Sequence, residues 1–554
     1  MLVLTVMSRR EKYVAGFGAA AIVVLIGLIV AGSILSRRIE PYIRLQAEQY
    51  LRTRFQADVR IASLRIRLPK LSPLRMLFTR GRGTIATVEG KGIVMRMWSR
   101  PDAPPLFAIQ KFVTGIDVGA LGDSALHVPV VTITGLEITI PPKGERPDMS
   151  SGESAADADD REAESKTSVV IDRLNVKKAT LVILPRDRAK KPLRFDIHDL
   201  KLQSGGPGVA MKYDAMLTNP RPPGEIHSFG SFGPWRSGEP GDTPLNGDYT
   251  FDHADLGVFS TVAGILQSTG RFEGELDSIT ARGEAYVPDF RLKRSGNPVP
   301  LRTKFEVLVD GTNGNTILKP ITATLGSTHF TTSGAVFKHD GDTHRSIKLN
   351  VNMPRGRMPD VLRLAMKGEP FMEGKLNLKT TLEVPNLGGK VKDKLRLEGR
   401  FDITEARFLK STIQDQIDSL SRRGQGQPKN QQIDEVISRM MGVFKLDSSV
   451  ITFRELTFGV SGAAVELDGS YDLNADVLDF HGVLKLEAKV SQTVTGWKHW
   501  ALKPIDRFLS KDGAGTYLKI QVVGNSKAPK FGRDRETAPA PKGTPSRLGS
   551  APRP

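Results

Sequence analysis

The residue types that most often carry out chemistry form no recognised pattern in this chain. The nine histidines are scattered, and no His-Glu-x-x-His or similar metal-ligand spacing occurs. The run from Gly205 to Gly208 lacks the lysine and the strand-to-helix context of a phosphate-binding loop, and no Gly-x-Ser-x-Gly elbow is present. There is no cysteine, which excludes disulfides, zinc–thiolate sites, iron–sulfur clusters and cysteine nucleophiles. The sequence therefore predicts a protein that is not an enzyme and that has no cofactor or metal.

A run of basic residues is the first pattern with a chemical meaning. Its candidates for contacting anionic lipid headgroups are Arg60, Arg65, Arg67 and Lys70, and the chain as a whole carries a formal charge of +18. A cation close to an anionic membrane surface gains about 1 kcal/mol. The alternative is an ordinary solvated strand face. Nucleic acid is not predicted as a partner, because no nucleic-acid-binding motif is present.

A long uncharged segment close to the N-terminus predicts a membrane anchor. No charged residue occurs from Val14 to Leu35, and about 20 such residues in a helix span a bilayer. We expect residues 14–36 to cross the membrane, with residues 1–13 in the cytoplasm and the remainder exported. A cleaved signal peptide ending near Ala31 or Ser33 is the alternative, but its apolar core is usually only about 7–15 residues long.

Alternation of apolar and polar residues predicts that most of the chain after residue 56 is β-strand. It is clear in Leu64–Leu68, Val130–Thr134, Lys304–Val309 and Ile347–Val351. Short helices are expected near both ends: at Glu40–Phe55, at about Ser411–Val443 with a break at Gly424–Pro428, and at Val494–Leu509. The acidic segment 146–168 and the Pro-rich tail 533–554 are expected to be disordered.

Glycines in the middle of many strands suggest a further property of the sheet. They include Gly247, Gly274, Gly374, Gly399 and Gly469. Interior glycine marks a bulge, a sharp bend or a close backbone approach. Repeated bends at similar depth would curl an antiparallel sheet into a trough with one apolar face, whereas corners of a closed β-sandwich use the same glycines.

The apolar side of such a sheet holds the second set of candidate residues. In an open trough they would face lipid, and in a closed sandwich they would be core. The candidates for facing lipid are Leu376, Leu378, Leu395, Leu397, Leu484 and Leu486. If the trough is open, Leu376→Asp should leave the protein folded and impair lipid loading, since water could reach the carboxylate.

The C-terminal region resembles the AsmA-like family of envelope proteins. The resemblance rests on an ordered set of passages: Leu395–Phe401, Leu467–Leu473, Leu478–Gly482, Leu484–Leu486, Val490–Gln492, Leu502–Asp506, Gly513–Gly515 and Val523–Asn525. The anchor, the short helix and Phe55–Ile61 are also similar to that family. These similarities divide the chain into an N-terminal AsmA-like β region (37–145), a central β region (169–394) and an AsmA-like C-terminal region (395–532).

The resemblance implies a mostly β protein: a transmembrane helix in the bacterial inner membrane, then an elongated, curled antiparallel sheet that forms a periplasmic groove. It implies a role in outer-envelope biogenesis, with phospholipid bound or conducted along the groove, and no catalytic residues carry over. The alternative function is a periplasmic scaffold or assembly factor for outer-membrane proteins. The expected partners are the inner membrane and phospholipid, with envelope proteins as further candidates.

Overall fold

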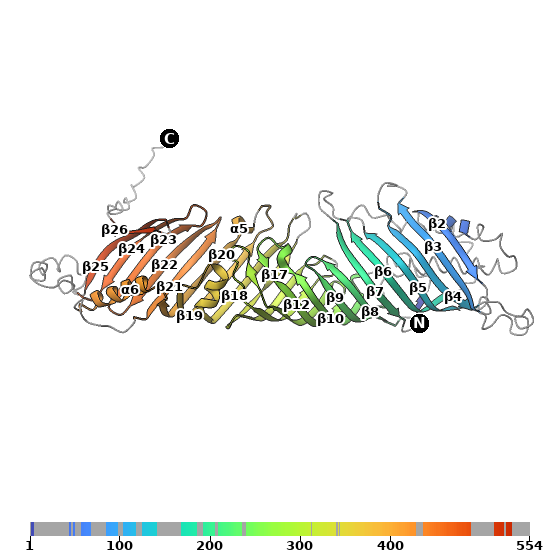
Figure 1. Ribbon diagram of the computed structural model, residues 1–554, viewed down its shortest axis with the longest axis horizontal. Helices are drawn as coiled ribbons and strands as arrows, with labels where there is room; N and C mark the ends of the chain where they lie inside the picture. The colour runs from blue at the N-terminus through green and yellow to red at the C-terminus, as the bar shows by residue number, and fades with distance from the viewer. Residues whose placement is uncertain are drawn as a thin grey trace, which may run out of the picture. The chain divides into compact units, whose positions relative to one another are not determined.

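A computed structural model shows that the protein is mostly β-strand (Figure 1). It describes residues 2–4, 44–45, 48–49, 52, 57–67, 85–97, 104–117, 125–140, 168–184, 192–204, 209–234, 240–311, 313–338, 342, 344–389, 391–427, 436–488, 515–525 and 528–534. The predicted anchor (14–36), the helix at 494–509, nearly all of the acidic segment 146–168 and residues 535–554 lie outside these ranges. No helix in the described ranges is long and apolar enough to cross a membrane.

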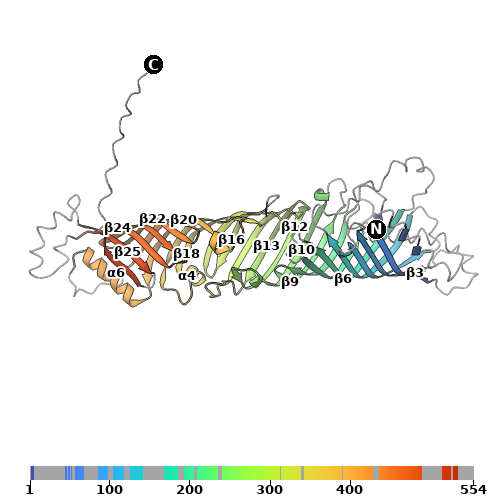
Figure 2. The same ribbon diagram turned by 90° about the horizontal axis from the view of Figure 1, so that it is seen from above.

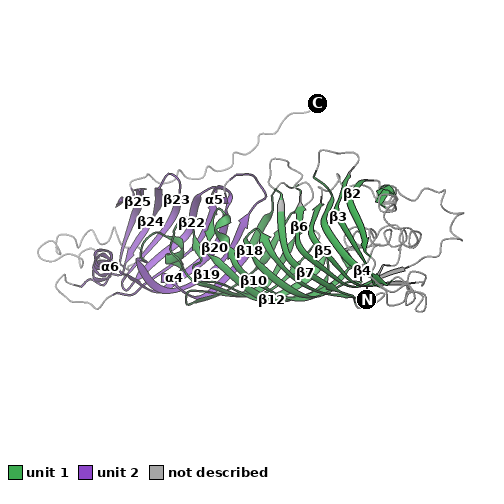
Figure 3. Cartoon of the chain, turned by 45° about the vertical axis from the view of Figure 1, so that its right-hand side comes forward, with its two compact units in different colours: residues 1–349, 360–369 green, residues 350–359, 370–554 purple. Residues whose placement is uncertain are grey.

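Two compact units make up the chain (Figure 3). Unit 1 comprises residues 1–349 and 360–369, and unit 2 comprises residues 350–359 and 370–554. The division runs through β18 (Ser346–Arg357), which is followed by α4 (Met358–Ala365). The boundaries at residues 145 and 394, which rested on composition and on family resemblance, stay predictions.

Unit 1 is a sheet in which nearly every strand pairs with the next one along the chain. Among the described strands of unit 1, only β5 and β6 pair in parallel; the other described pairs are antiparallel. Its strands are β1 (Leu2–Leu4), β2 (Ala57–Arg67), β3 (Ile85–Met97), β4 (Phe107–Asp117), β5 (Ala125–Ile140), β6 (Ser168–Ile183), β7 (Leu193–Gln203), β8 (Met211–Pro220), β9 (Pro223–Phe232), β10 (Pro244–Asp255), β12 (Ile265–Glu275), β13 (Ser278–Val287), β15 (Leu301–Val309), β16 (Thr316–Leu325) and β17 (Thr328–Phe337).

Unit 1 also contains several minor features. A two-stranded sheet joins β11 (Val262–Ala263) to β14 (Arg291–Leu292), and two short 3-10 helices, η4 (Pro240–Asp242) and η5 (Leu256–Val258), lie between strands. Strand β1 pairs with the beginning of β6. This pairing is incompatible with the predicted placement of residues 1–13 in the cytoplasm if β6 is exported, so the two arrangements exclude each other.

Unit 2 is an antiparallel meander. Strands β19 (Met372–Val384), β20 (Arg396–Phe408), β21 (Ser438–Asp447), β22 (Val450–Val460), β23 (Ala463–Asp472), β24 (Val477–Leu486), β25 (Thr516–Asn525) and β26 (Ala528–Arg533) each pair with the next. The short helix α5 (Val391–Lys394) precedes β20. The prediction of a mostly β, antiparallel protein is thus confirmed.

Helix α6 (Ser411–Gly424) confirms the first half of the helix predicted after residue 410 and crosses the ends of several strands (Figure 2). Gln414 donates to the carbonyl of Val436 (3.0 Å), and the hydroxyl of Ser421 donates to the carbonyl of Ser461 (2.8 Å). The second half of the prediction is wrong, because Ser438–Asp447 is β21. The apolar residues of this segment fit the spacing of a helix as well as that of a strand. Pairing with β20, which places Met440 opposite Ile403, favours the strand.

The helix predicted at Glu40–Phe55 is confirmed at residues 44, 45, 48, 49 and 52, which are helical. Its side chains contact the outer edge of β2. The carboxylate of Glu48 accepts a hydrogen bond from the N–H of Ile61 (2.8 Å), and Arg52 donates to the carbonyl of Val59 (3.0 Å). Arg44 donates to the carbonyl of Ala62 (3.3 Å). These contacts occupy backbone groups of an edge strand that would otherwise be open to another strand.

A row of irregular positions crosses six neighbouring strands of unit 1. We call this row the crease; it consists of Ala62, Gly92, Gln110, Gly135, Lys178 and His198, which the register places opposite one another. Gly92, Gly135 and Lys178 have positive φ values of 62°, 67° and 57°. In β3 the buried residues are Val88 and Gly90 before the crease and Ile93 and Met95 after it, so the alternation changes phase there. The same face therefore stays buried along the whole strand.

The core of unit 1 lies on that face. Fully buried side chains from β2, β3, β4, β5 and β6 pack together there, including Val59, Leu64, Val88, Val128 and Val176. The opposite face carries charged residues. Because of the phase change at Ala62, Arg60 and Arg65 share this exposed face although they are five residues apart.

Candidate functional site

One side of the unit 2 sheet is apolar over its full width. We call this side the apolar face. Register places its side chains in rows that run from strand to strand across the sheet. One row contains Thr380, Gly399, Phe444, Phe453, Gly469, Phe480, Val522 and Phe531, and a second contains Leu376, Ile403, Met440, Phe458, Val465, Leu484 and Leu518. A row that continues across the strands gives a continuous apolar surface.

The other side of the same strands is charged and exposed. Along β19 the exposed residues are Glu373, Lys375, Asn377 and Lys379, and along β20 they include Arg396, Glu398 and Arg400. Several of these charges are paired across strands. Arg439 makes two hydrogen bonds to Asp402 (2.9 and 2.6 Å), and these hold the pKa of Arg439 above its usual value. The two sides of the sheet therefore differ sharply in polarity.

The predicted lipid-facing leucines lie on the apolar face, with different degrees of exposure. Leu378, Leu397, Leu484 and Leu486 are half-buried. Leu376 is only 4% exposed and stands opposite Ile403, which is equally buried. Leu395 is half-buried and directly precedes β20, with its N–H bonded to the carbonyl of Val391 (2.9 Å). Within the described residues, no second sheet packs on this face in the manner of a β-sandwich.

Glycines on the apolar face lie beneath aromatic rings of the adjacent strand. Phe401 stands opposite Gly442, and Phe480 stands opposite Gly469. A Cβ at Gly442 would come 3.3 Å from the ring of Phe401, and one at Gly469 would come 2.9 Å from the ring of Phe480. Rings that lie along the backbone of a glycine project less above the sheet. The glycines therefore keep this face smooth.

The phenylalanine rings also contact one another. Their centroids are 6.2 Å apart for Phe401 and Phe444, 6.3 Å for Phe401 and Phe453, and 5.9 Å for Phe453 and Phe480. These distances fall in the range for favourable aromatic pairs. The rings thus form a connected aromatic strip from β20 to β24.

Unit 1 repeats the glycine–aromatic arrangement in β10 and β12. Gly247 stands opposite Phe272, and Tyr249 stands opposite Gly270. Here hydroxyls accompany the rings: Tyr249 is 3.1 Å from the hydroxyl of Ser268, and Tyr213 is 3.1 Å from that of Ser228. Burial raises the pKa of both tyrosines above the usual value. The face of unit 1 that carries these rings is consequently more polar than the apolar face of unit 2.

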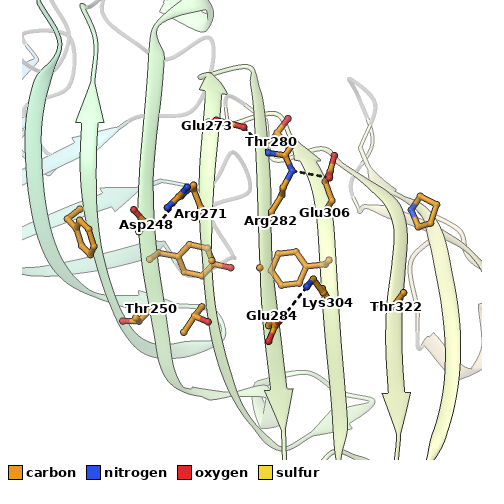
Figure 4. A pocket seen from close by; sticks show the side chains of 17 residues that line it. Asp248, Thr250, Arg271, Glu273, Thr280, Arg282, Glu284, Lys304, Glu306 and Thr322 are labelled. Carbon is orange, nitrogen blue, oxygen red and sulfur yellow. Dashed lines mark hydrogen bonds and ion pairs between the residues drawn. The ribbon is translucent and has the colours of Figure 1, made fainter.

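The charged face of β10–β16 encloses a shallow depression of about 840 Å³ (Figure 4). Arg282 lies between Glu273 (2.8 Å) and Glu306 (3.0 Å), and Asp248 pairs with Arg271 (3.1 Å). Glu284 pairs with Lys304, and Lys319 also pairs with Glu306. Each carboxylate here has a cationic partner, so the depression offers no unmatched charge to a ligand. It is a solvated strand face with cross-strand ion pairs.

The predicted headgroup-contacting arginines are all exposed, and two of them are already paired. Arg60 lies 3.0 Å from Asp58, and Arg67 lies 3.6 Å from Glu89. Arg65 is exposed and stands opposite Glu89 in the register. Lys70 lies outside the described residues. The structure thus brings three of the four residues to one face of β2, with two acidic residues among them.

The ion pairs that Glu89 makes with two lysines were not predicted from the sequence. The carboxylate of Glu89 lies 3.2 Å from both Lys91 and Lys111, which stand directly opposite each other on β3 and β4. Hydrogen bonds from Lys111 and then Lys91 lower the pKa of Glu89. The two lysines are far apart in sequence, so only knowledge of the register could have revealed the need for an anion between them.

The described residues contain one group of carboxylates close enough to share a cation: Asp242, Glu275 and Asp277. Asp277 is exposed, and exposed acidic groups of this kind are common without a metal. No metal or catalytic role is assigned to them.

The chain matches no protein-family model, no curated protein and no solved structure.

Proposed function

We propose that this is a membrane-anchored envelope protein that binds phospholipid, with the acyl chains lying on the apolar face of unit 2. The observation that carries the proposal is that many side chains of this face are only half-buried, among them Leu378, Leu397, Phe444, Phe453 and Leu484. Contiguous apolar surface left partly open to water normally receives an apolar ligand or partner. Sheltering a methylene group contributes about 0.8 kcal/mol, so a chain of many methylenes binds without any strong polar contact.

The glycine–aromatic pairs support an acyl chain as the ligand. In a closed sandwich, large side chains project about halfway across the roughly 10 Å between sheets and interdigitate. Here the rings of Phe401 and Phe480 lie over glycines instead. A smooth face with low relief suits a flexible chain that lies along it. The bulges in β20 and β22 support a unit 2 sheet that curls around such a ligand.

The remaining parts of the proposal come from the sequence. An anchor at residues 14–36 in the inner membrane would leave the bulk of the chain in the periplasm, and residues 2–4 would then lie across the membrane from β6 instead of pairing with it. The resemblance to AsmA-like proteins supports a role in outer-envelope biogenesis, with phospholipid conducted along the groove. In this arrangement the exposed Arg60, Arg65 and Arg67 would meet anionic headgroups at the membrane surface.

Site-specific photocrosslinking tests the proposal in living cells. The photoreactive amino acid p-benzoylphenylalanine is introduced in place of Phe444, on the apolar face, or in place of its neighbour Lys445, on the charged face. Irradiation followed by purification and mass spectrometry should recover phospholipid from the Phe444 site and none from the Lys445 site. Equal recovery from both sites, or protein but never lipid from the Phe444 site, would refute lipid binding.

A role as a scaffold or assembly factor for outer-membrane proteins is the second candidate. One observation favours it: the edge strand β26 pairs only with β25 among the described strands. An open sheet edge can accept a strand from another protein.

A further inference from the structure

Strands β2 and β26 are edge strands, and they differ in whether side chains occupy their outer backbone groups. The edge of β2 is occupied by Glu48 and Arg52, which bond to the backbone of Ile61 and Val59. No described side chain bonds to the outer edge of β26. An unprotected edge is an interaction surface unless something blocks it.

The backbone of β26 has a defined set of outward groups. Pro529 has no N–H and stands opposite Gly524, so it occupies a position that does not donate to β25. Residues two apart have the same orientation, so the N–H and C=O of Phe531 also face away from β25. Asp534 is an odd number of residues from Phe531, so its N–H should point toward β25. It does so, because it donates to the carbonyl of Lys519 (3.3 Å). Phe531 and Arg533 can therefore pair with an added strand.

The side chains of this edge define the chemistry of the partner. Phe531 is 76% exposed, although it ends the row that contains the buried Phe480. Lys519, Lys530 and Arg533 carry no ion pair with any described residue. The edge thus combines an uncovered aromatic ring with unmatched positive charge.

We propose that β26 accepts a strand from a partner protein in which apolar residues alternate with acidic ones. The apolar residues would cover Phe531 and extend the rows of the apolar face, and the acidic residues would neutralise Lys519 and Lys530 on the other face. A second copy of β26 fits less well, because its own Lys530 and Arg533 would add positive charge. The residues after Asp534 fit poorly too, since they are basic overall and rich in proline.

The proposal does not depend on lipid binding, and its test separates the two. The full chain, purified in detergent, is titrated with two short fluorescent peptides and followed by anisotropy. One peptide alternates Val or Ile with Glu, and the other replaces every Glu with Lys. The acidic peptide should bind at least about tenfold more tightly than the basic one. Equal affinity for the two would overturn the proposal.

Three variants locate the site. Phe531→Pro removes an outward N–H without touching the pairing to β25 and should abolish binding, whereas Phe531→Ala should weaken it by roughly tenfold. Lys530→Glu should reverse the preference between the two peptides.

Phe229→Ala is the matched control, because Phe229 is also an exposed phenylalanine, at 47%, but lies in unit 1. This variant should bind the acidic peptide as the parent does. A parent thermal transition in each variant would show that it is folded.

Two results would contradict the proposal directly. Unchanged binding by a folded Phe531→Pro variant would place the peptide elsewhere. Dimerisation of the full chain in sedimentation, lost on Phe531→Pro, would make a second copy the occupant of the edge. Loss of lipid at Phe444 in the crosslinking experiment, with peptide binding intact, would leave this inference standing while refuting the proposed function.

Discussion

Phe480 on β24 lies directly opposite Gly469 on β23, and its ring occupies the space that a side chain at Gly469 would need. A Cβ at Gly469 would come 2.9 Å from Cδ1 of Phe480 and 2.2 Å from the carbonyl oxygen of Asp479. Side-chain rings can move, but a backbone carbonyl in a sheet cannot move without breaking the ladder. The glycine is therefore required both by the ring and by the close approach of the two strands.

Gly469→Ala should consequently destabilise unit 2 by about 1–3 kcal/mol, the usual range for overpacking. The measurement is the midpoint of thermal unfolding of the purified protein. Gly459→Ala on the neighbouring β22 is the control, since no atom lies within 4 Å of the position of its Cβ. That change should be neutral or slightly stabilising. Equal loss of stability in both variants would show that the close contact at Gly469 is not the cause.

Leu378→Asp should reduce the amount of phospholipid that co-purifies with the protein while leaving it folded. Leu378 is half-buried on the apolar face, opposite Phe401, so water can still reach a carboxylate there. Lys379→Asp, on the exposed side of the same strand, is the matched control and should not change the lipid content. Mass spectrometry of extracted lipid gives the measurement. If both variants retain the parent amount of lipid, the apolar face is not the binding surface.

Leu376→Asp now has a different expected outcome from the one that the sequence suggested. Alternation correctly placed Leu376 and Leu378 on one face, because side-chain direction has a period of two. It could not reveal that Leu376 is 4% exposed whereas Leu378 is more open. Exposure depends on neighbours from other strands, such as Ile403, and hence on register. A charge at Leu376 should cost several kcal/mol and unfold unit 2.

The mid-strand glycines predicted features of the sheet more reliably than helical periodicity predicted the helices. Close backbone approach was one of the reasons expected for mid-strand glycine, and it is found at Gly399 and Gly469, where a Cβ would meet a neighbouring carbonyl oxygen. The crease was not predicted, since only Gly92 and Gly135 among its residues are glycine. The crease arises from matching irregularities in six consecutive strands, and no single strand displays it.

Glu89→Gln should lower the thermal stability of unit 1 at neutral pH. Hydrogen bonds from Lys111 and Lys91 lower the pKa of Glu89, so its stabilising effect is present above the pKa of an unfolded-chain glutamate, about 4.3. This effect is lost as the pH falls through the lower pKa of the folded state. Without the carboxylate, Lys91 and Lys111 repel each other.

Thermal unfolding at several pH values and salt concentrations checks this prediction. The difference between parent and variant should shrink in acid and in about 1 M salt, where the Debye length is about 3 Å. Glu284→Gln is the control, because its pair with Lys304 is 3.7 Å long and the glutamate side chain is 71% exposed. A variant at Glu89 that melts like the parent at low salt would show that the two lysines do not strain the sheet.

The attachment of the C-terminal end of β26 should weaken as the pH rises. His481 lies 2.9 Å from Asp534 and 3.1 Å from Asp479, and the hydrogen bond to Asp534 is the main reason that its pKa is raised. A raised pKa means that the stabilisation is complete below the unfolded value of about 6.5 and is lost as the pH rises through the folded value. Amide hydrogen exchange of residues 528–534, corrected for intrinsic rates, should therefore accelerate at higher pH. His481→Gln should remove this dependence; persistence of the dependence would assign it to another group.

Glu48 should control access to the edge of β2. Its carboxylate accepts a hydrogen bond from the N–H of Ile61 at 2.8 Å, and Arg52 holds the same segment through the carbonyl of Val59 at 3.0 Å. Glu48→Ala removes the acceptor, so the amide of Ile61 should exchange faster with deuterated water. Glu48→Gln keeps an oxygen at the same position and should restore most of the protection. With its edge unblocked, the alanine variant should also self-associate more readily in size-exclusion chromatography. Identical exchange at Ile61 in all three proteins would mean that the helical segment does not protect this strand.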